Sequence, residues 1–432
     1  MGELKEELKE ELHEIRDELR HDVRSAEETV LTFFKWLIVA GITGLAGGAV
    51  GTTFHVSVQW AAELRAAQPW MLWLLPAGGL LIAASYRLCR MENTNTNAII
   101  DAIHFGDDVP LLLVPCIYLA TVITHLFGGS AGREGAALQI GGSIGCQIGR
   151  LFRLDEKDMR LATLCGMSAV FSALFGTPLT ATIFALEVIS VGVFYYSALV
   201  PCIVAALLGC GISLLCGIEP TRFLVSPEPV HALMLVQVAV LAVGCSVMSI
   251  VFCLVMHGTE HVLTKHIPNS YLRIALGGLL IVGLTYLVGT GDYNGAGMDL
   301  ITRAIEQGQA RPFAFALKLL FTAITIGAGF KGGEVIPTFF IGATLGCVLG
   351  PLLGLPAGFA AAVGLVCVFC GAVNCPIASM VLSVELFGAG GLIYFALACG
   401  VAYMLSGYFG LYSSQKILYS KLKAEFINIH AR

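Results

Sequence analysis

The segments GREGAALQIGGSIGC, residues 132–146, and GEVIPTFFIGATLGC, residues 333–347, align with an offset of 201 residues. Each begins at a glycine and continues as an apolar segment with glycines at regular spacing, which is typical of a helix that starts abruptly inside a packed protein. Glu134 in the first copy corresponds to Val335 in the second. Duplicated, glycine-broken helix starts in an apolar chain are typical of ion transporters built from two internal repeats.

Two further blocks recur in the same order. Residues 95–110 share their spacing of isoleucine, glycine and proline with residues 297–312, at an offset of 202. Residues 176–187 recur as residues 374–385, at an offset of 198. Three blocks in the same order predict a chain made of two similar halves.

The proline-rich stretch at 220–229 provides the boundary between the halves. We therefore expect two transmembrane repeat halves, residues 29–220 and 221–415, followed by a cytoplasmic tail, residues 416–432. Residues 1–28 are highly charged, with leucine, isoleucine or valine at every third or fourth position, which indicates an amphipathic cytoplasmic helix. Both a helix covering the membrane domain and a short coiled coil fit this pattern.

The composition is that of an integral membrane protein. Of the 432 residues, 56% are hydrophobic and 13% are charged, and the mean hydropathy is +0.81. A soluble domain carries about 25% charged residues. The net charge of −5 gives no indication of a nucleic-acid partner, and the 14 cysteines, mostly within apolar runs, predict no metal site and no cofactor.

Several apolar segments are shorter than the roughly 20 residues that span a bilayer, and others are interrupted by glycine or proline at 176–178, 332–333 and 374–376. These features predict an all-α membrane protein with tilted and broken helices. Basic residues cluster at 150–160 and again at 416–432, so we expect both regions, and both termini, on the cytoplasmic side of the cell (inner) membrane.

The helix start at residues 132–135 has the chemistry of an anion site. Free backbone N–H groups and the helix dipole attract anions, and Gly132 and Gly135 allow an anion to approach closely. Glu134 is then a tethered anion that competes with a transported anion and releases the site when it takes up a proton. The alternative is that Glu134 pairs only with Arg133 and caps its own helix.

The sequence resembles the CLC family of chloride channels and proton-coupled anion exchangers. The resemblance rests, in order, on GREG at 132–135, Val-Ile-Pro at 335–337 and Leu-Tyr-Ser at 411–413. It implies an inverted-repeat fold and a homodimer with one anion pathway in each subunit. By the same resemblance, Glu134 is the external gating glutamate, and the hydroxyl of Tyr412 faces the central anion.

Departures from the family pattern point to its fluoride-exporting branch. The first anion-binding loop reads NTNTN at 93–97, and Asn95 stands where chloride-transporting members have serine. Ala136 follows the GREG element, and Glu334 and Val335 precede the Ile-Pro pair. Val188 stands where exchangers carry a second, inward proton glutamate, so a passive channel remains an alternative.

The resemblance implies that the anion is surrounded by residues of both halves. The principal candidates are Asn95, Val335, Ile336, Tyr412, Gly132, Arg133 and Gly135. Further candidates are Lys331, Thr94 and Thr338. Fluoride is strongly hydrated, so close N–H and O–H donors suit it, and Asn95 offers such a donor. Asn95 could instead only satisfy backbone groups of its loop, and Lys331 could be a boundary charge that reaches water.

We therefore predict a proton-coupled fluoride exporter rather than an enzyme, with fluoride, protons, membrane lipid and a second copy of the chain as partners. A chloride or nitrate carrier of the same family is the runner-up. Residues 257–261 match the H-x-x-E-H zinc-peptidase pattern, but Gly258 weakens the helix and we expect no zinc site. Glu187 and Glu385, equivalent in the repeat, are expected to bond backbone N–H groups across the breaks.

Overall fold

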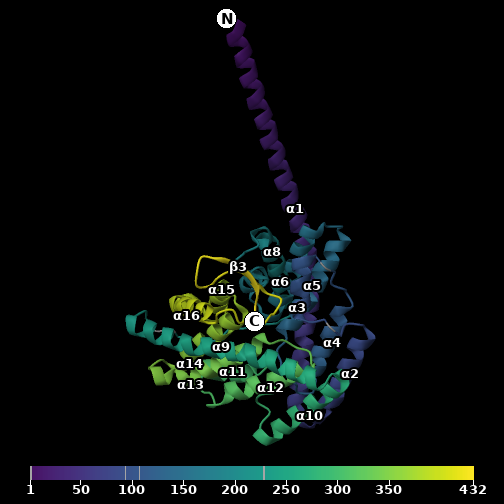
Figure 1. Ribbon diagram of the computed structural model, residues 1–432, viewed down its shortest axis with the longest axis vertical. Helices are drawn as coiled ribbons and strands as arrows, with labels where there is room; N and C mark the ends of the chain where they lie inside the picture. The colour runs from purple at the N-terminus through teal and green to yellow at the C-terminus, as the bar shows by residue number, and fades with distance from the viewer. Residues whose placement is uncertain (1, 93, 107, 227–228) are drawn as a thin grey trace.

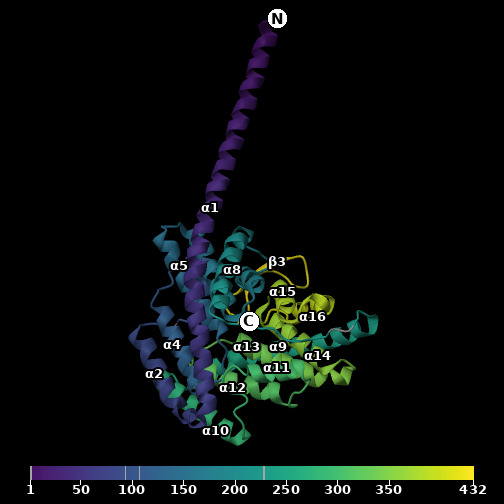
Figure 2. The same ribbon diagram turned by 180° about the vertical axis from the view of Figure 1, so that it is seen from behind.

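The computed structural model describes residues 2–92, 94–106, 108–226 and 229–432, and this part of the chain forms sixteen α-helices and one small sheet. The helices gather into one body, from which the N-terminal helix α1 projects far beyond the others (Figures 1 and 2). The first-half helices are α1 (Gly2–Ala67), α2 (Leu75–Leu88), α3 (Thr96–Phe105), α4 (Leu113–Leu126), α5 (Glu134–Leu151), α6 (Glu156–Phe175), α7 (Pro178–Glu187) and α8 (Leu199–Leu215).

The second half repeats this order. Its helices are α9 (Ala232–His266), α10 (Ser270–Val288), α11 (Met298–Glu306), α12 (Ala314–Ala328), α13 (Val335–Leu349), α14 (Ala357–Val373), α15 (Pro376–Phe387) and α16 (Leu392–Leu405). Short 3₁₀ turns lie at η1 (Pro69–Leu74), η2 (Tyr196–Ala198), η3 (Pro351–Leu353) and η4 (Ala389–Gly391). Helices α3 to α7 correspond one by one to α11 to α15, as the repeated blocks predict.

The helix predicted for residues 1–28 is present, and it continues through residue 28 without a break as helix α1. Its 66 residues make a rod of about 100 Å, longer than a bilayer is thick. The apolar part that is long enough to cross a membrane is Ser25–Ala67. The charged segment 1–28 and the first apolar segment are therefore one continuous helix.

Within the described residues, seven helical spans are long and apolar enough to cross a membrane. The other apolar helices, such as α4, α7 and α12, have 10 to 17 residues. Large apolar side chains are exposed on the outside of the body, among them Leu45, Leu207, Val247 and Leu279. An outer surface of this kind suits lipid.

Close backbone contact joins α5 to α6 and, equivalently, α13 to α14. A Cβ placed on Gly145 would lie 2.1 Å from the carbonyl oxygen of Ala162, and one on Gly346 would lie 2.1 Å from that of Ala360. Only glycine permits this approach, which is how small residues bring membrane helices together. The same device at equivalent positions fixes the two helices whose first turns form the candidate site.

The breaks before α7 and α15 are held by reciprocal carboxylates. Glu187, at the end of α7, accepts hydrogen bonds from the N–H groups of Ile377 and Ala378, at 3.1 and 2.8 Å. Glu385, in α15, accepts two from the first turn of α7, at 3.0 and 2.8 Å. Each acid satisfies N–H groups that a helix start leaves without partners, which confirms the predicted structural role.

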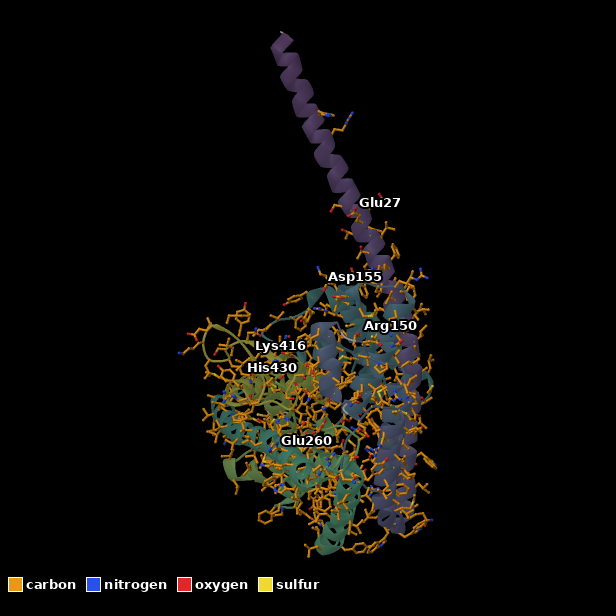
Figure 3. The ribbon with its side chains drawn as sticks, turned by 45° about the vertical axis from the view of Figure 1, so that its right-hand side comes forward. Glu27, Arg150, Asp155, Glu260, Lys416 and His430 are labelled. Carbon is orange, nitrogen blue, oxygen red and sulfur yellow. The ribbon has the colours of Figure 1, made fainter. Side chains whose placement is uncertain are left out.

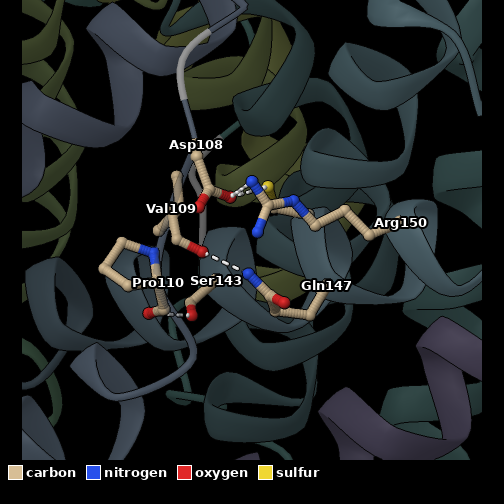
Figure 4. Close-up of polar contacts among 7 residues, drawn as sticks. Asp108, Val109, Pro110, Ser143, Gln147 and Arg150 are labelled. Carbon is tan, nitrogen blue, oxygen red and sulfur yellow. Dashed lines mark hydrogen bonds and ion pairs between the residues drawn. The ribbon is translucent and has the colours of Figure 1, made fainter.

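The loop that precedes α4 is attached to the last turns of α5 (Figure 4). Arg150 forms an ion pair with Asp108 at 2.6 Å. The side chains of Gln147 and Ser143 donate hydrogen bonds to the carbonyl groups of the next two loop residues, at 2.7 and 2.8 Å. These contacts hold the far end of the helix whose first residue is Glu134.

Residues 416–432, expected only as a tail, form two strands of a small sheet. Strand β2 (Lys416–Tyr419) pairs in parallel with β1 (Ser190–Val191) and antiparallel with β3 (Phe426–His430). The backbone N–H of Gly410 donates to the carbonyl of Arg432 at 3.0 Å. The C-terminal strand therefore fastens the loop at 408–415, which contains Tyr412.

Candidate functional site: two facing helix starts between two cavities

The first turns of α5 and α13 meet at a short antiparallel bridge between Gly132 and Gly333. The two backbone hydrogen bonds of the bridge measure 2.7 and 2.8 Å. A Cβ on Gly132 would lie 2.2 Å from Oε2 of Glu134, and one on Gly333 would lie 2.6 Å from the backbone nitrogen of Glu134. The backbone clash at Gly333 requires glycine there, whereas a side chain at residue 132 would first meet the Glu134 carboxylate. The two repeated segments, 201 residues apart in sequence, form one junction.

Glu134 is fully buried at this junction. Its Oε2 accepts a hydrogen bond from the backbone N–H of Arg133 at 3.1 Å and another from that of Ile336 at 3.2 Å. Its Oε1 has no hydrogen-bond partner among the described residues. The carboxylate thus occupies the N-terminus of α13 in the other half, where free N–H groups and the helix dipole favour an anion. A glutamate that only capped its own helix would not make this bond.

A cavity of about 400 Å³ opens on one side of the junction, and we call it the Tyr412 cavity. The hydroxyl oxygen of Tyr412 is buried and has no hydrogen-bond partner among the described residues. The polar and charged residues that line the cavity are Glu92, Thr94, Asn95, Thr96, Asn97, Gln139, His257, Glu260, Thr264, Arg273, Lys331, Glu334, Tyr412 and Ser413.

A second cavity, of about 470 Å³, opens on the other side, and we call it the Arg65 cavity. Its polar and charged lining residues are His55, Gln59, Glu63, Arg65, His125, Arg133, Asp292, Asn294 and Asp299. Ile336, whose N–H bonds Glu134, also lines this cavity, whereas Glu334, two residues earlier, lines the Tyr412 cavity. Glu134 therefore lies in the wall that separates the two cavities.

Six of the predicted site residues come together at the junction, namely Gly132, Arg133, Glu134, Gly135, Val335 and Ile336. Gly135 packs closely against Gly333 of the other half. Four more line the Tyr412 cavity, namely Thr94, Asn95, Lys331 and Tyr412. Thr338 does not join them, because its hydroxyl donates to the carbonyl of Val335 at 2.6 Å and it lines neither cavity.

Asn95 and Lys331 each combine two of the roles considered from sequence. The Oδ1 atom of Asn95 accepts a hydrogen bond from the N–H of Ala98 at 3.2 Å and so caps α3, while the residue also lines the Tyr412 cavity. The ammonium of Lys331 lies 4.4 Å from the ring centre of Tyr86 and the residue lines the same cavity. Lys331 is therefore a charge in the cavity wall, a position from which it can both attract anions and reach water.

Sequence reasoning missed several polar residues around the junction. Gln139 donates to the hydroxyl of Thr96 at 3.2 Å, and that hydroxyl lies 3.4 Å from the carbonyl oxygen of Gly135. Arg65 and Lys318 lie near the opposite side and were not singled out. The sequence did contain an indication of both residues, because a charged residue within an apolar membrane helix marks a functional position by default.

The zinc-peptidase pattern finds no support in the geometry. His257 forms a hydrogen bond with the carbonyl of Leu411 at 3.1 Å, and His261 is exposed. Across the described ranges, no three His, Cys, Asp or Glu side chains are placed to share a metal ion. Cys367 and Cys370 have C-x-x-C spacing, but both thiols lie against backbone carbonyls of α16.

Comparison with known proteins places this arrangement in a family. The family model described as Voltage gated chloride channel matches residues 78–407. A chloride/fluoride channel protein of Pseudomonas syringae pv. tomato is 38% identical over 398 residues, covering 90% of this chain and 87% of the relative. This chain belongs to the CLC family of voltage gated chloride channels. As a CLC protein it is an integral, multi-pass membrane protein, as its apolar helices also indicate.

The CLC fold is shared with solved structures. The crystal structure of a CLC-type fluoride/proton antiporter matches with a TM-score of 0.85 at 33% identity, covering 89% of this chain and 98% of the other. A slow cyanobacterial Cl-/H+ antiporter matches with a TM-score of 0.75 at 20% identity, covering 86% and 94%, which supports the fold alone. An H(+)/Cl(-) exchange transporter of Yersinia pestis bv. Antiqua is 24% identical over 81% of this chain and 80% of its own. Among these proteins, this CLC chain is most like those named for fluoride.

Proposed function

We propose that this CLC protein exports fluoride from the cytoplasm in exchange for protons. The observation that carries the proposal is the bond from the N–H of Ile336 to the buried carboxylate of Glu134, made across the two repeats between two separate cavities. A carboxylate at a helix start occupies a place suited to an anion. Fluoride and the carboxylate would therefore occupy the junction in turn.

The carboxylate supplies both the gate and the proton carrier. While it is ionised, Glu134 holds the N–H groups that an anion needs, so fluoride and the side chain compete. Protonation removes the charge and weakens both bonds, because a charged acceptor binds N–H groups more strongly than a neutral one. A glutamate that swings toward the Arg65 cavity could then exchange its proton there while fluoride passes the junction.

Selectivity for fluoride is supported by the surroundings of the Tyr412 cavity and by the relatives. Asn95 brings an amide to that cavity, and Tyr412 brings a buried hydroxyl that has no partner among the described residues. Such O–H and N–H groups are hard donors that suit a strongly hydrated anion. The CLC-type fluoride/proton antiporter is the structural neighbour with a TM-score of 0.85, and this supports the assignment of fluoride as substrate.

The proposed orientation places the end of the body that holds Arg150 toward the cytoplasm, and we propose that the Tyr412 cavity opens to that side. Figure 3 shows Arg150 and Asp155 at the end of the body from which α1 projects, and the basic residues of this region predict the cytoplasmic side. Both termini would then lie in the cytoplasm. We further propose a homodimer in the cell (inner) membrane, with one pathway in each subunit and lipid around the apolar outer surface.

The proton route from the cytoplasm does not use residue 188. Val188 is fully buried, and its carbonyl accepts a hydrogen bond from the side chain of Gln415 at 2.9 Å. Acids that line the Tyr412 cavity, such as Glu260 and Glu334, are the available groups on that side. A coupled route through this cavity would distinguish the protein from family members that carry a glutamate at the equivalent of Val188.

The test is a comparison of fluoride and chloride efflux from liposomes with simultaneous pH recording. Fluoride efflux accompanied by proton uptake, with much slower chloride efflux, supports the proposal. Chloride efflux equal to that of fluoride would instead favour a chloride/proton antiporter, the runner-up supported by the 24% identical exchange transporter. Fluoride efflux without proton movement would favour a passive anion channel, the alternative raised by Val188.

A further inference from the structure

The Arg65 cavity has a charge arrangement that the junction does not explain. Two guanidinium groups line it, those of Arg65 at the end of α1 and Arg133 just before α5. In both side chains the Nε atom is buried and has no hydrogen-bond partner within the described chain. The ion pairs found among the described residues within 4.0 Å include neither arginine.

A third positive group lies behind the cavity wall. Lys318 of α12 is fully buried, and its ammonium donates to the carbonyl groups of Tyr293 and Gly295 at 3.2 and 2.6 Å. It also lies 5.4 Å from the ring centre of Phe340. Carbonyl and ring contacts satisfy its donors but supply no opposite charge. The loop that includes Tyr293 and Gly295 also forms part of the cavity wall at Asn294.

His125 adds an unsatisfied polar atom to the same cavity. The side chain is 1% exposed, and its Nδ1 bonds the carbonyl of Thr121 at 2.9 Å. Its Nε2 has no partner among the described residues. Because Nδ1 donates to a carbonyl, Nε2 of the neutral ring is a buried acceptor without a partner. Among the described residues of this cavity, the buried donors without acceptors are therefore the Nε atoms of Arg65 and Arg133.

The acidic residues of the cavity do not neutralise these groups. Asp292 pairs with Arg311 at 3.4 Å, and Glu63 accepts a hydrogen bond from Gln59 at 2.9 Å. Asp299 and Glu63 are exposed to solvent. The carboxylates thus lie at the rim or are already engaged, whereas the cations lie deeper. The buried Glu134 carboxylate at the junction attracts Arg133 and Lys318, but it supplies one negative charge beside three cations, and an anion taken from solution reduces the remaining cost.

We propose that the Arg65 cavity binds a small monovalent inorganic anion, a halide, between the guanidinium groups of Arg65 and Arg133. The site is separate from the junction occupied by the Glu134 carboxylate, although Arg133 and Ile336 contribute to both. Lys318 strengthens the site through its charge, without touching the anion. The inference does not depend on which anion the protein transports or on proton coupling.

Bromide locates the site, because its anomalous scattering identifies it in crystals. In bromide-soaked crystals of the intact protein, we expect an anomalous peak between the two guanidinium groups. Arg65→Gln should remove the peak and Lys318→Met should weaken it. Arg87→Gln serves as the matched control, since Arg87 lies in apolar helix α2, pairs only loosely with Glu92 at 4.0 Å and is 68% exposed. This control should keep the full peak.

Measuring the affinity for bromide in solution makes the test quantitative. One charge-assisted hydrogen bond is worth about 1.5–3 kcal/mol, so Arg65→Gln should weaken bromide binding about tenfold or more, as measured by calorimetry on the detergent-purified protein. Competition by chloride or by fluoride against bromide identifies which halide occupies the cavity. An empty cavity in the wild-type crystals, or a peak that persists unchanged in Arg65→Gln, would overturn the proposal. Neither result would alter the liposome test of fluoride export.

Discussion

Residues 132–146 and 333–347 have the same fold in the two halves, but the side chains at their helix starts are chemically opposed. Glu134 is matched by Val335, so one half supplies the carboxylate and the other the N–H groups that bind it. Arg133 is matched by Glu334, and these two line opposite cavities. The duplicated backbone thus provides two similar helix starts, and a few substitutions give each start its own charge.

The far ends of the two equivalent helices differ as well. In α5, Ser143, Gln147 and Arg150 bind the loop before α4 through polar side chains. In α13, Thr344 bonds carbonyl groups of its own helix, and Val348 and Pro351 follow at the other equivalent positions. Among the described residues, the helix that carries the titratable residue therefore has side-chain attachments to a loop that its counterpart lacks. The following variants test which differences between the halves matter, and by how much.

The largest effect is expected from Glu134→Gln, which removes the titratable difference between the halves. The amide cannot take up and release a proton, so proton movement coupled to fluoride efflux should be abolished. Liposome flux with simultaneous pH recording measures this directly. Glu156→Gln, at an exposed position in the first turn of α6, should leave coupling intact. Full proton-coupled transport by Glu134→Gln would refute the role of this residue.

The next largest effect is expected on protein stability, from replacing the glycines at which α5 packs against α6 and α13 against α14. Gly145→Ala and Gly346→Ala each place a methyl group 2.1 Å from a backbone carbonyl oxygen, so the helix pair must separate. We expect each to destabilise the protein by about 1–3 kcal/mol or more, by similar amounts. Thermal unfolding in detergent is the measurement. Gly283→Ala, in α10 with no atom within 4 Å of the added Cβ, is the control and should be neutral or stabilising. Markedly unequal losses of stability would show that the two helix pairs do not contribute equally to the stability of the fold.

Glu187→Ala and Glu385→Ala test the reciprocal carboxylates. Each substitution leaves two N–H groups at a helix start without their acceptor, and loss of a helix cap costs about 0.5–2 kcal/mol. The larger loss is expected for Glu187, which is 8% exposed, because water cannot easily replace it. The midpoint of thermal unfolding measures the loss of stability in each variant, and Glu156→Ala is the comparison variant. A stronger effect from Glu385 would contradict this reasoning.

The smallest effect is expected from Arg150→Gln, which removes a polar attachment found only in the first half. The pair with Asp108 is 49% and 42% exposed, and exposed ion pairs contribute about 0–1 kcal/mol. The difference from wild type should shrink further in high salt, since salt screens exposed charges. Unfolding curves of Arg150→Gln and of the wild type at low and high ionic strength measure this difference in stability. A loss that is large and independent of salt would mean that the loop attachment is essential to the position of α5.

The repeat in the sequence was sufficient to predict which distant segments are equivalent. It placed the starts of α5 and α13, the breaks before α7 and α15, and the structural use of Glu187 and Glu385. These features are local or duplicated, so they are visible as glycine and proline at fixed spacing. The continuity of α1 across residue 28 was not predicted, because a change from charged to apolar residues need not interrupt a helix.

By itself, therefore, the sequence determined a membrane-spanning chain with two similar halves. It also determined that an equivalent helix in each half begins next to glycines, and that a carboxylate, Glu134, stands at this start in the first half. Tertiary structure alone decided which N–H groups donate to this carboxylate and that the Thr338 hydroxyl bonds its own helix. It also decided that Arg65 and Arg133 line one cavity and that Lys318 bonds the loop at Gly295. The reason is physical. Hydropathy and helix breaks act over a few neighbouring residues, whereas charge compensation in a cavity depends on side chains that folding brings together from hundreds of residues apart.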